Sequence, residues 1–327
     1  MICLGIESTA HTFGVGIMDS DKRVLANVKR LYTTQEGGMI PGRVADHHTD
    51  ICGEVLVEAL AKSGLTLDDI DIVSYSQSPG IGNCLRIGKL MAKSLALKYD
   101  KPLVGVNHCI AHLEIGCALT SAKDPILLYA SGANTQVIAF EAGKYRIFGE
   151  TLDMGVGNFI DAFARELGLG FPGGPAVEKL ALSGKEFVEI PYVVKGMDIS
   201  LGGIFTNLRQ KIESGKYAKE DLCFSMQETV FAMLCETTER ALAHCGKKEV
   251  VLGGGVACNK RLQKMVTDMC TARGALAYWP ENQFLVDNGA MIAWLGIISY
   301  QVGCKEDLIK TDINPYLRTD QVNVTWR

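Results

Sequence analysis

Two short apolar runs joined by a small polar loop occur twice along the chain. Each copy has the same order of apolar run, loop and apolar run: residues 2–6, 8–12 and 13–18, then residues 126–129, 131–135 and 136–140. The loops begin at residues 8 and 131, an offset of 123 residues, and their sequences are STAHT and SGANT. Short apolar runs that flank a turn are typical of β-hairpins. The pattern therefore predicts an internal repeat built on two hairpins.

A second pattern also occurs twice, namely an apolar run, a glycine turn and a helix. Residues 71–75 lead to a turn at residues 79–82 and then to an amphipathic helix. Residues 249–252 lead to three glycines at 253–255 and to a helix that is expected to begin near Asn259. Strand, glycine turn and helix are the parts of an α/β fold.

The repeats together predict an α/β protein of two related lobes, over residues 1–125 and 126–327, with a ligand cleft between them. Loop amides and a helix N-terminus favour phosphate anions, so the paired loops and the triple glycine predict a nucleotide site. The alternative is that the glycines only form turns. Residues 82–89 do not make a P-loop, because their spacing is one residue too long and Leu90 stands where Ser or Thr is needed.

The composition narrows the classes of function. The chain has 327 residues, of which 47% are hydrophobic and 21% charged, and this balance excludes a disordered protein. Lys and Arg number 33 against 37 Asp and Glu, which gives a net charge of −4. A protein that holds nucleic acid alone is usually basic. Any nucleic acid bound here would need a local cationic patch or a partner.

Cysteines and apolar segments indicate a cytoplasmic location. The 11 cysteines are odd in number and form no C-x-x-C motif, so they are expected to be reduced thiols of an intracellular protein. The N-terminus lacks the basic region and the long apolar run of a signal peptide. The uncharged residues 288–304 fall short of a membrane span and predict a buried helix.

Two histidines form a pattern that is typical of a metal site. The apolar run 103–106 ends at Asn107, a good helix N-cap, and His108 and His112 then stand one helical turn apart. Two imidazoles at this spacing can bind one divalent metal, or they can be a pair of polar residues at a helix start. Asp287 is a candidate third ligand, or the N-cap of the next helix, or both.

The remaining features limit the metal chemistry. Cys109 stands where an H-E-x-x-H metallopeptidase has its glutamate base, which argues against that class.

Two other histidines carry no metal-site pattern. His47 and His48 adjoin Asp46 and Asp50 in a polar segment and are expected to be solvated or to pack in a loop.

Six segments together resemble one family, the universal threonylcarbamoyltransferases called Kae/TsaD, formerly Gcp. They are residues 5–12, 106–112, 131–135, 171–175, 253–259 and 287–289, and they span most of the chain. The archaeal and eukaryotic branch, the catalytic subunit of the KEOPS complex, is the most similar.

The resemblance implies an actin/Hsp70/sugar-kinase (ASKHA) fold and a metal-dependent enzyme. Such an enzyme transfers the threonylcarbamoyl group of threonylcarbamoyl-AMP to the exocyclic amine of adenosine 37 in tRNAs that read codons beginning with A. The implied cofactors are one divalent metal, iron or zinc, and an adenine nucleotide, either the adenylate substrate or ATP. The implied partners are a small atypical Rio-like protein kinase, two small accessory subunits and tRNA held through the complex, with no membrane.

The resemblance also assigns residues. His108, His112 and Asp287 match the catalytic metal ligands, and Tyr129 matches a further ligand of the archaeal branch. The residues implied in binding the nucleotide substrate are Tyr129, Ala130, Ser131, Gly132, Ala133, Asn134, Asp161, Gly174, Glu178, Gly254 and Asn259.

Several of these assignments carry a departure or an alternative. Ala133 departs from the family's usual glycine, and its methyl group is expected to narrow the loop where the phosphate approaches. Asp161 has the alternative of an ion pair with Arg165, and Glu178 that of a favourable carboxylate at a helix start. Three other functions stay open: a metallopeptidase, an ATP-dependent sugar kinase, and a nucleotide-binding scaffold for a kinase partner.

Overall fold

The computed structural model describes residues 1–34 and 39–327. These residues divide into two compact units. The first unit contains Met1–Leu119, Gly143–Tyr145 and Asp287–Arg327, and the second contains Thr120–Ala142 and Arg146–Val286. The expected lobes placed residues 287–327 with the C-terminal half. The structure groups them with the first unit instead, because the helix that follows Asp287 packs on the first sheet.

The first unit is built on a five-stranded mixed sheet in the order β3-β2-β1-β4-β5. Its strands are β1 (Ile2–Glu7), β2 (Thr12–Asp19), β3 (Val24–Leu31), β4 (Ile72–Ser78) and β5 (Leu103–Asn107). The first three strands run antiparallel, and β4 and β5 run parallel to β1. The predicted first hairpin and the predicted strand, glycine turn and helix are therefore confirmed.

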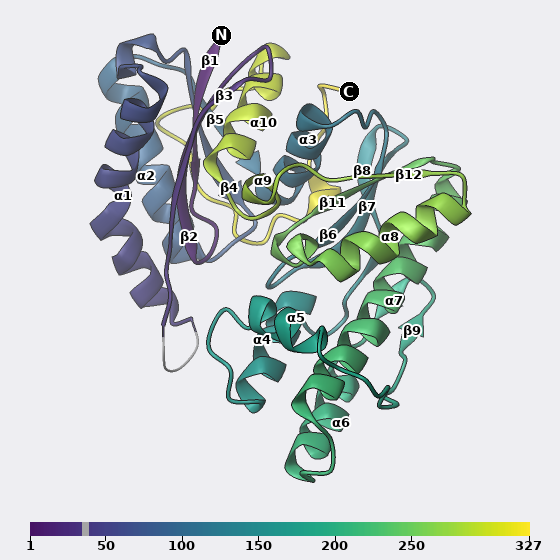
Figure 1. The fold of residues 1–327 in the computed structure, drawn as a ribbon. Helices are drawn as coiled ribbons and strands as arrows, with labels where there is room; N and C mark the ends of the chain where they lie inside the picture. The colour runs from purple at the N-terminus through teal and green to yellow at the C-terminus, as the bar shows by residue number, and fades with distance from the viewer. Residues whose placement is uncertain (35–38) are drawn as a thin grey trace. The chain divides into compact units, whose positions relative to one another are not determined.

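Helices cover both faces of this sheet. They are α1 (Pro41–Ser63), α2 (Gly82–Tyr99), α3 (His108–Leu119) and α10 (Gly289–Gln301), with short 3₁₀ turns η1 (Leu67–Asp69) and η3 (Thr319–Gln321). Figure 1 shows α1 and α2 on one side of the sheet and α10 on the other. Successive strand residues point to opposite faces. Leu4 and Ile6 accordingly enter the apolar core beneath α1 and α2, while Gly5 between them meets α10.

The second unit repeats this strand order in a sheet arranged β12-β11-β6-β7-β8. Its strands are β6 (Ile126–Ala130), β7 (Thr135–Glu141), β8 (Lys144–Glu150), β11 (Glu249–Gly253) and β12 (Leu276–Tyr278), with a separate small hairpin of β9 (Val194–Lys195) and β10 (Asp198–Ile199). Its helices are α4 (Val156–Glu166), α5 (Gly174–Ala181), α6 (Gly202–Glu213), α7 (Lys219–Cys245), α8 (Lys260–Ala272) and α9 (Asn282–Leu285), with the 3₁₀ turn η2 (Gly255–Cys258). The predicted repeat is thus present in both sheets.

Two expectations about single segments have different outcomes. The uncharged segment forms α10, whose residues are nearly all buried, as predicted. Residues 41–63 form α1, with Pro41 at its start, and His48 lies on the buried side of this helix. The expectation of a solvated or loop-packing side chain is therefore wrong for His48.

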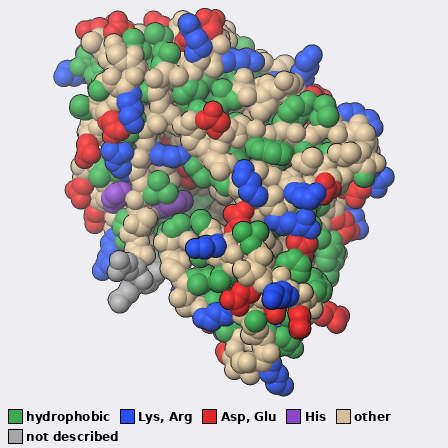
Figure 2. All heavy atoms as spheres, viewed as in Figure 1, with side chains coloured by type: hydrophobic (Ala, Val, Ile, Leu, Met, Phe, Trp, Pro, Cys, Tyr) green, Lys and Arg blue, Asp and Glu red, His purple; other side chains and the backbone are tan. Residues whose placement is uncertain are grey.

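Three further observations bear on the chemistry. All eleven cysteines are free thiols. Among the described residues, no helix combines the length and the apolar character needed to cross a membrane. Lys and Arg side chains lie among Asp and Glu side chains on the face in view (Figure 2), in line with the near balance of charge along the chain.

Candidate functional site

The start of α3 places two histidines on one face. Asn107, the last residue of β5, accepts hydrogen bonds at its Oδ1 from the backbone nitrogens of Cys109, 3.0 Å away, and Ile110, 3.2 Å away. The predicted N-cap is confirmed, since it supplies acceptors for two of the orphan N–H groups of the helix. His108 and His112 follow in the first two turns, with ring centroids 4.8 Å apart.

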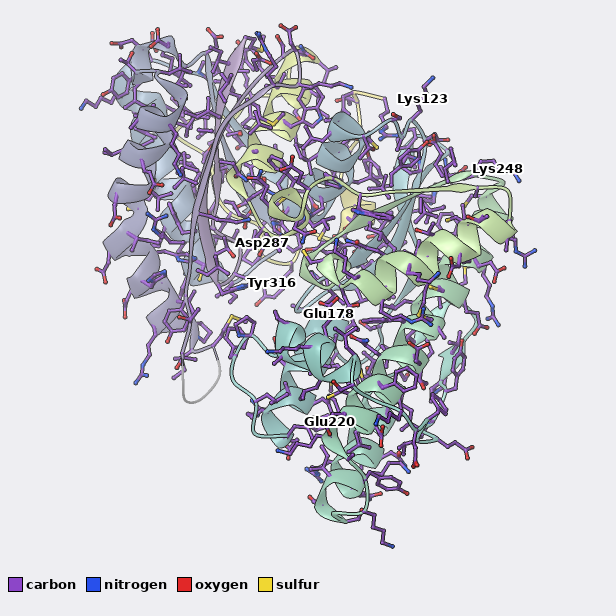
Figure 3. The ribbon with its side chains drawn as sticks, viewed as in Figure 1. Lys123, Glu178, Glu220, Lys248, Asp287 and Tyr316 are labelled. Carbon is purple, nitrogen blue, oxygen red and sulfur yellow. The ribbon has the colours of Figure 1, made fainter. Side chains whose placement is uncertain are left out.

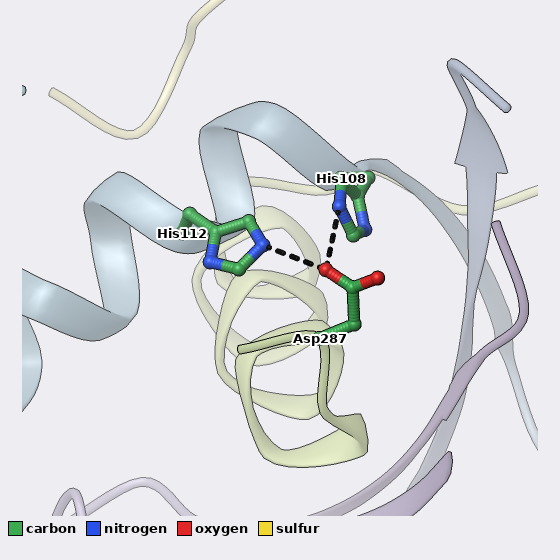
Figure 4. Close-up of side chains that lie close together, drawn as sticks. All are labelled: His108, His112 and Asp287. Atoms are coloured by element: carbon green, nitrogen blue, oxygen red, sulfur yellow. Dashed lines mark hydrogen bonds and ion pairs between the residues drawn. The ribbon is translucent and has the colours of Figure 1, made fainter. Parts of the chain in front are cut away.

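Asp287 supplies a carboxylate to this pair from far along the chain. It directly precedes α10 (Figure 3), and its Oδ1 lies 3.3 Å from His108 Nε2 and 3.3 Å from His112 Nε2 (Figure 4). The N-cap of α10 is Asn288, whose Oδ1 accepts the backbone N–H of Met291 at 3.0 Å. Asp287 is therefore not the cap, and one of its oxygens faces both imidazoles.

These three residues have the donor chemistry of a metal site. Their ligand atoms all lie within 4.8 Å of one another, and they provide two imidazole nitrogens and one carboxylate oxygen. Burial lowers the pKa of His112, which favours the neutral imidazole that metals bind. Burial opposes the ionisation of Asp287, but the two histidines outweigh it and hold the pKa of its carboxyl well below the usual range. Two imidazoles and an ionised carboxylate suit a zinc or iron ion that keeps open positions.

The residue that follows His108 offers no base. Cys109 is buried, and burial raises the pKa of its thiol. The position at which a zincin carries its glutamate therefore holds a protonated thiol, as the sequence argument against a metallopeptidase requires.

A buried glutamate beside His108 was not predicted as part of the site. Glu7, at the end of β1, has no exposed surface, and its Oε2 lies 2.9 Å from His108 Nδ1. Its Oε1 accepts hydrogen bonds from the backbone N–H of Thr9 at 2.7 Å and from the Thr9 hydroxyl at 2.5 Å. The available signal in the sequence was a single glutamate that ends an apolar strand, which does not by itself identify a partner.

In the second unit, the predicted phosphate loop is a tight turn fixed to α4. The backbone N–H and the hydroxyl of Ser131 both donate to the carbonyl of Asn134 at 2.9 Å. The carbonyls of Ser131 and Gly132 accept hydrogen bonds at 2.9 Å from Gly157 and Asn158 at the start of α4. Gly132 and Ala133 remain exposed at the tip of the turn.

The glycine turn after β11 lies beside this loop. Gly254 has φ +90°, and a Cβ atom on it would stand 2.3 Å from the carbonyl oxygen of Ala130 and 2.9 Å from the nitrogen of Ser131. Only glycine combines this backbone conformation with so close an approach. Tyr129, buried in β6, pairs with Gly253 of β11. It belongs to the second unit, whereas His108, His112 and Asp287 belong to the first, so its role as a ligand stays a prediction.

The remaining predicted residues form a second group around α5 and the start of α8. Glu178 of α5 (Figure 3) accepts the backbone N–H of Lys260 at 2.7 Å. Asn259 caps α8, since its Oδ1 accepts from the nitrogens of Arg261 and Leu262 at 2.9 and 3.2 Å. The carboxylate of Glu178 therefore accepts a backbone N–H group at the start of α8, and not one at the start of its own helix α5.

Asp161 of α4 completes this group. Its Oδ1 accepts the backbone N–H of Gly173 at 2.7 Å, directly before Gly174 at the start of α5. The structure thus brings Asp161 to the first turn of α5, and brings Glu178 and Asn259 to the first turn of α8.

Comparison with known proteins identifies relatives over the full chain. A family profile described as "TsaD: tRNA N6-adenosine threonylcarbamoyltransferase" matches residues 23–294. The chain is 52% identical over 326 residues to a protein of that name from Thermococcus kodakarensis, covering 100% of both chains. It is 47% identical over 324 residues to one from Thermofilum pendens, covering 99% of this chain and 96% of the relative. It is also 48% identical over 326 residues to a "probable bifunctional tRNA threonylcarbamoyladenosine biosynthesis protein" of Methanocaldococcus jannaschii, covering 100% of this chain and 60% of that protein.

Solved structures share the fold at low sequence identity. The HypF protein of Thermococcus kodakarensis matches with a TM-score of 0.63 and 17% identity, over 90% of this chain and 47% of HypF. Component A of the (R)-2-hydroxyglutaryl-CoA dehydratase of Acidaminococcus fermentans matches with a TM-score of 0.58 and 15% identity, over 90% of this chain and 97% of the other. With the repeated sheets, these likenesses confirm the expected ASKHA-type fold.

Proposed function

The chain belongs to the tRNA N6-adenosine threonylcarbamoyltransferase family, and we propose that it uses threonylcarbamoyl-AMP to modify adenosine 37 in tRNAs that read codons beginning with A. The exocyclic amine forms a bond to the carbamoyl carbon, the bond from that carbon to the phosphate oxygen breaks, and AMP leaves. The amine gives up one proton in the exchange. The observation that carries the proposal is the convergence of His108, His112 and Asp287 in a chain of this family.

We propose that these three side chains hold one divalent metal, zinc or iron, with Tyr129 as a further ligand. When bound, such an ion supplies Lewis acidity toward a carbonyl or phosphate oxygen. The lowered pKa of His112 favours a neutral imidazole with a lone pair to offer, and the ionised Asp287 offsets part of the positive charge.

We propose that the second unit holds the nucleotide. The exposed tip of the turn, Gly132 and Ala133, has no bulky side chain in the way, which suits the approach of a phosphate to its backbone. The N–H groups of Ser131 and Gly254 donate to the carbonyls of Asn134 and Leu285, so they fix the shape of the turn. The carboxylates of Asp161 and Glu178 suit ribose hydroxyl groups by their acceptor chemistry, and Gly174 and Asn259 lie beside them. AMP is a good leaving group, so positioning of the weakly nucleophilic amine is the main demand on the protein.

Partners follow from charge and from the bifunctional relatives. A net charge of −4, with Lys and Arg side chains lying among Asp and Glu side chains on the face shown in Figure 2, gives weak attraction for tRNA phosphates. We propose that a small atypical Rio-like kinase and two small accessory subunits of a KEOPS complex supply this affinity in the cytoplasm. The longer bifunctional relatives, of which this chain spans about 60%, agree with a close partner.

The test reconstitutes the reaction. The purified chain is mixed with tRNA, threonine, bicarbonate, ATP, an adenylate-forming enzyme and the accessory subunits, and digested tRNA is analysed for threonylcarbamoyladenosine by mass spectrometry. Product is expected, and it should disappear with a chelator or with Asp287→Ala. Asp268→Ala is the matched control, because this carboxylate lies in an exposed ion pair with Lys264 and should be dispensable. Absence of product with all partners shown to be active would reject the proposal.

A further inference from the structure

We propose that Glu7 is a positioning residue of the metal centre, which holds the His108 ring so that its Nε2 faces the ion. The inference rests on the metal site of the proposed function and adds a residue to it. Glu7 acts through His108, because its carboxylate contacts the ring nitrogen that faces away from Asp287.

The first argument is the cost of burying a carboxylate. The Glu7 side chain has no exposed surface, and an ionised group in such a place is tolerated only when its oxygens are hydrogen-bonded. Oε1 receives the backbone N–H and the hydroxyl of Thr9, and Oε2 lies 2.9 Å from His108 Nδ1. The loop after β1 therefore holds Oε1 of Glu7 by two hydrogen bonds, and Oε2 is directed at His108.

The second argument is the tautomer of His108. A neutral imidazole carries one N–H, and its position is set by the partner of each nitrogen. With a carboxylate oxygen 2.9 Å away, the proton belongs on Nδ1, and the lone pair belongs on Nε2. Nε2 lies 3.3 Å from Asp287 Oδ1, on the side where an ion would be held. Carboxylates that accept a hydrogen bond from a metal-binding histidine orient the ring and raise its basicity.

The third argument is the anchoring of Glu7 itself. The Thr9 hydroxyl donates to Glu7 Oε1 at 2.5 Å and also lies 3.3 Å from His108 Nδ1. The neighbouring Ser8 donates its backbone N–H to the hydroxyl of Ser76 in β4 at 3.0 Å. The first hairpin loop is thus tied to the sheet and to the metal-binding helix α3, so that the position of Glu7 is fixed before any ion binds.

The experiment measures binding of Zn²⁺ alone to the purified full chain, without tRNA or partners. Zn²⁺ affinity is determined by competition with a chromophoric chelator, and the protonated nitrogen of His108 is identified by ¹⁵N NMR of the metal-free protein. Glu7→Ala is expected to weaken Zn²⁺ binding by about 10- to 100-fold and to shift the His108 proton partly to Nε2. Glu7→Gln keeps an oxygen that can accept from Nδ1, so it should restore the Nδ1–H tautomer and most of the affinity.

Two further variants separate positioning from stability. Glu114→Gln removes another buried carboxylate on α3, one that accepts from Trp326 Nε1 at 3.1 Å and Arg327 Nε at 2.9 Å, and it should leave Zn²⁺ affinity and the tautomer unchanged. Thr9→Val removes the hydroxyl that holds Glu7, so a smaller loss of affinity is expected. This variant and Glu7→Gln decide the question if Glu7→Ala does not fold.

The outcomes are distinct. Folded Glu7→Ala with wild-type affinity and an unchanged tautomer would overturn the inference, as would Glu114→Gln weakening binding equally. If the wild-type chain binds no Zn²⁺, the metal site of the proposed function fails as well. If it binds Zn²⁺ but makes no modified tRNA in the reconstituted reaction, the proposed function fails while the role of Glu7 stands.

Discussion

Gly289 at the start of α10 lies directly against the backbone of Gly16 in β2. A Cβ atom on Gly289 would stand 2.1 Å from the nitrogen of Gly16 and 2.8 Å from the carbonyl oxygen of Gly5. The helix can rest on the sheet only because these three positions have no side chain. Asp287 lies two residues before Gly289, so this contact also sets the place of the third side chain of the proposed metal site.

Substitution of Gly16 should therefore lower the stability of the protein and disturb the proposed metal site. In Gly16→Ala, the new Cβ would stand 2.1 Å from the nitrogen of Ala290 and 2.3 Å from the carbonyl carbon of Gly289. These are backbone atoms that cannot rotate away, so a loss of about 3 kcal/mol or more in the free energy of unfolding is expected. Chemical denaturation and metal analysis measure the two effects.

Gly53→Ala is the matched control. Gly53 lies in the middle of α1, and a Cβ there would meet nothing within 4 Å. Alanine should therefore stabilise the protein by about 0.5–1 kcal/mol, because glycine in a helix costs conformational entropy. Equal stability of the two variants would show that α10 is free to shift and that the close contact is unimportant.

The three side chains of the proposed metal site should act as one set. His108→Ala combined with His112→Ala removes both imidazole ligands, and the purified protein should then hold almost no divalent metal and give no transfer product. His244→Ala, which removes a histidine packed on Phe148 in the second unit, should keep both. Elemental analysis with the reconstituted assay tests this. A double variant with full metal content and activity would mean that the ion is held elsewhere.

The proposed metal site shows which part of a site could be predicted from the sequence. His108 and His112 were identified because the N-cap at Asn107 and the spacing of one helical turn are local features. Asp287 could be named only as a candidate with two possible roles, since it lies 175 residues beyond His112. Its position depends on how α10 packs on the sheet, which is a matter of long-range contacts.

Glu7 was not identified and His48 was misjudged for the same reason. Glu7 lies 101 residues before His108, and nothing in the local pattern of β1 indicates this partner. His48 lies in a polar segment of the sequence. The sequence of that segment does not show which side of the helix faces the sheet, and His48 is buried on that side. The hairpins and the strand, glycine turn and helix units were predictable because each is specified by neighbouring residues.

The loop between β6 and β7 contains Ala133, where the family resemblance leads us to expect glycine, and the effect of this difference can be tested. Ala133 lies exposed at the tip of the turn that we propose for the phosphate. Ala133→Gly should widen the approach and lower the dissociation constant for AMP by about three- to tenfold, measured by calorimetry. Ala142→Gly is the control, because Ala142 has φ +51°, which glycine adopts readily, and lies outside the loop. An unchanged affinity in Ala133→Gly would show that the methyl group does not obstruct the phosphate.

The buried His48 of α1 should make stability depend on pH. Its Nε2 donates to the carbonyl oxygen of Ala10 at 2.8 Å, and its ring packs against Phe13. Burial lowers the pKa of His48 from 6.5 to about 4, although the Ala10 carbonyl acts in the opposite direction. The unfolded chain therefore takes up a proton at a higher pH than the folded protein does. The contribution of His48 is complete above pH 6.5 and is lost as the pH falls from about 6.5 to about 4.

His48→Gln isolates this contribution. Glutamine can still donate to the Ala10 carbonyl but does not titrate, so the variant should lose less stability than the wild type between pH 6.5 and pH 5. A single titrating group changes the free energy of unfolding by at most about 1.4 kcal/mol per pH unit. Urea denaturation of both proteins at several pH values gives the difference directly, because other titrating groups contribute equally to both and cancel. Parallel stability curves would show that His48 is protonated as easily in the folded protein as in the unfolded chain, and that its burial against Phe13 does not hold in solution.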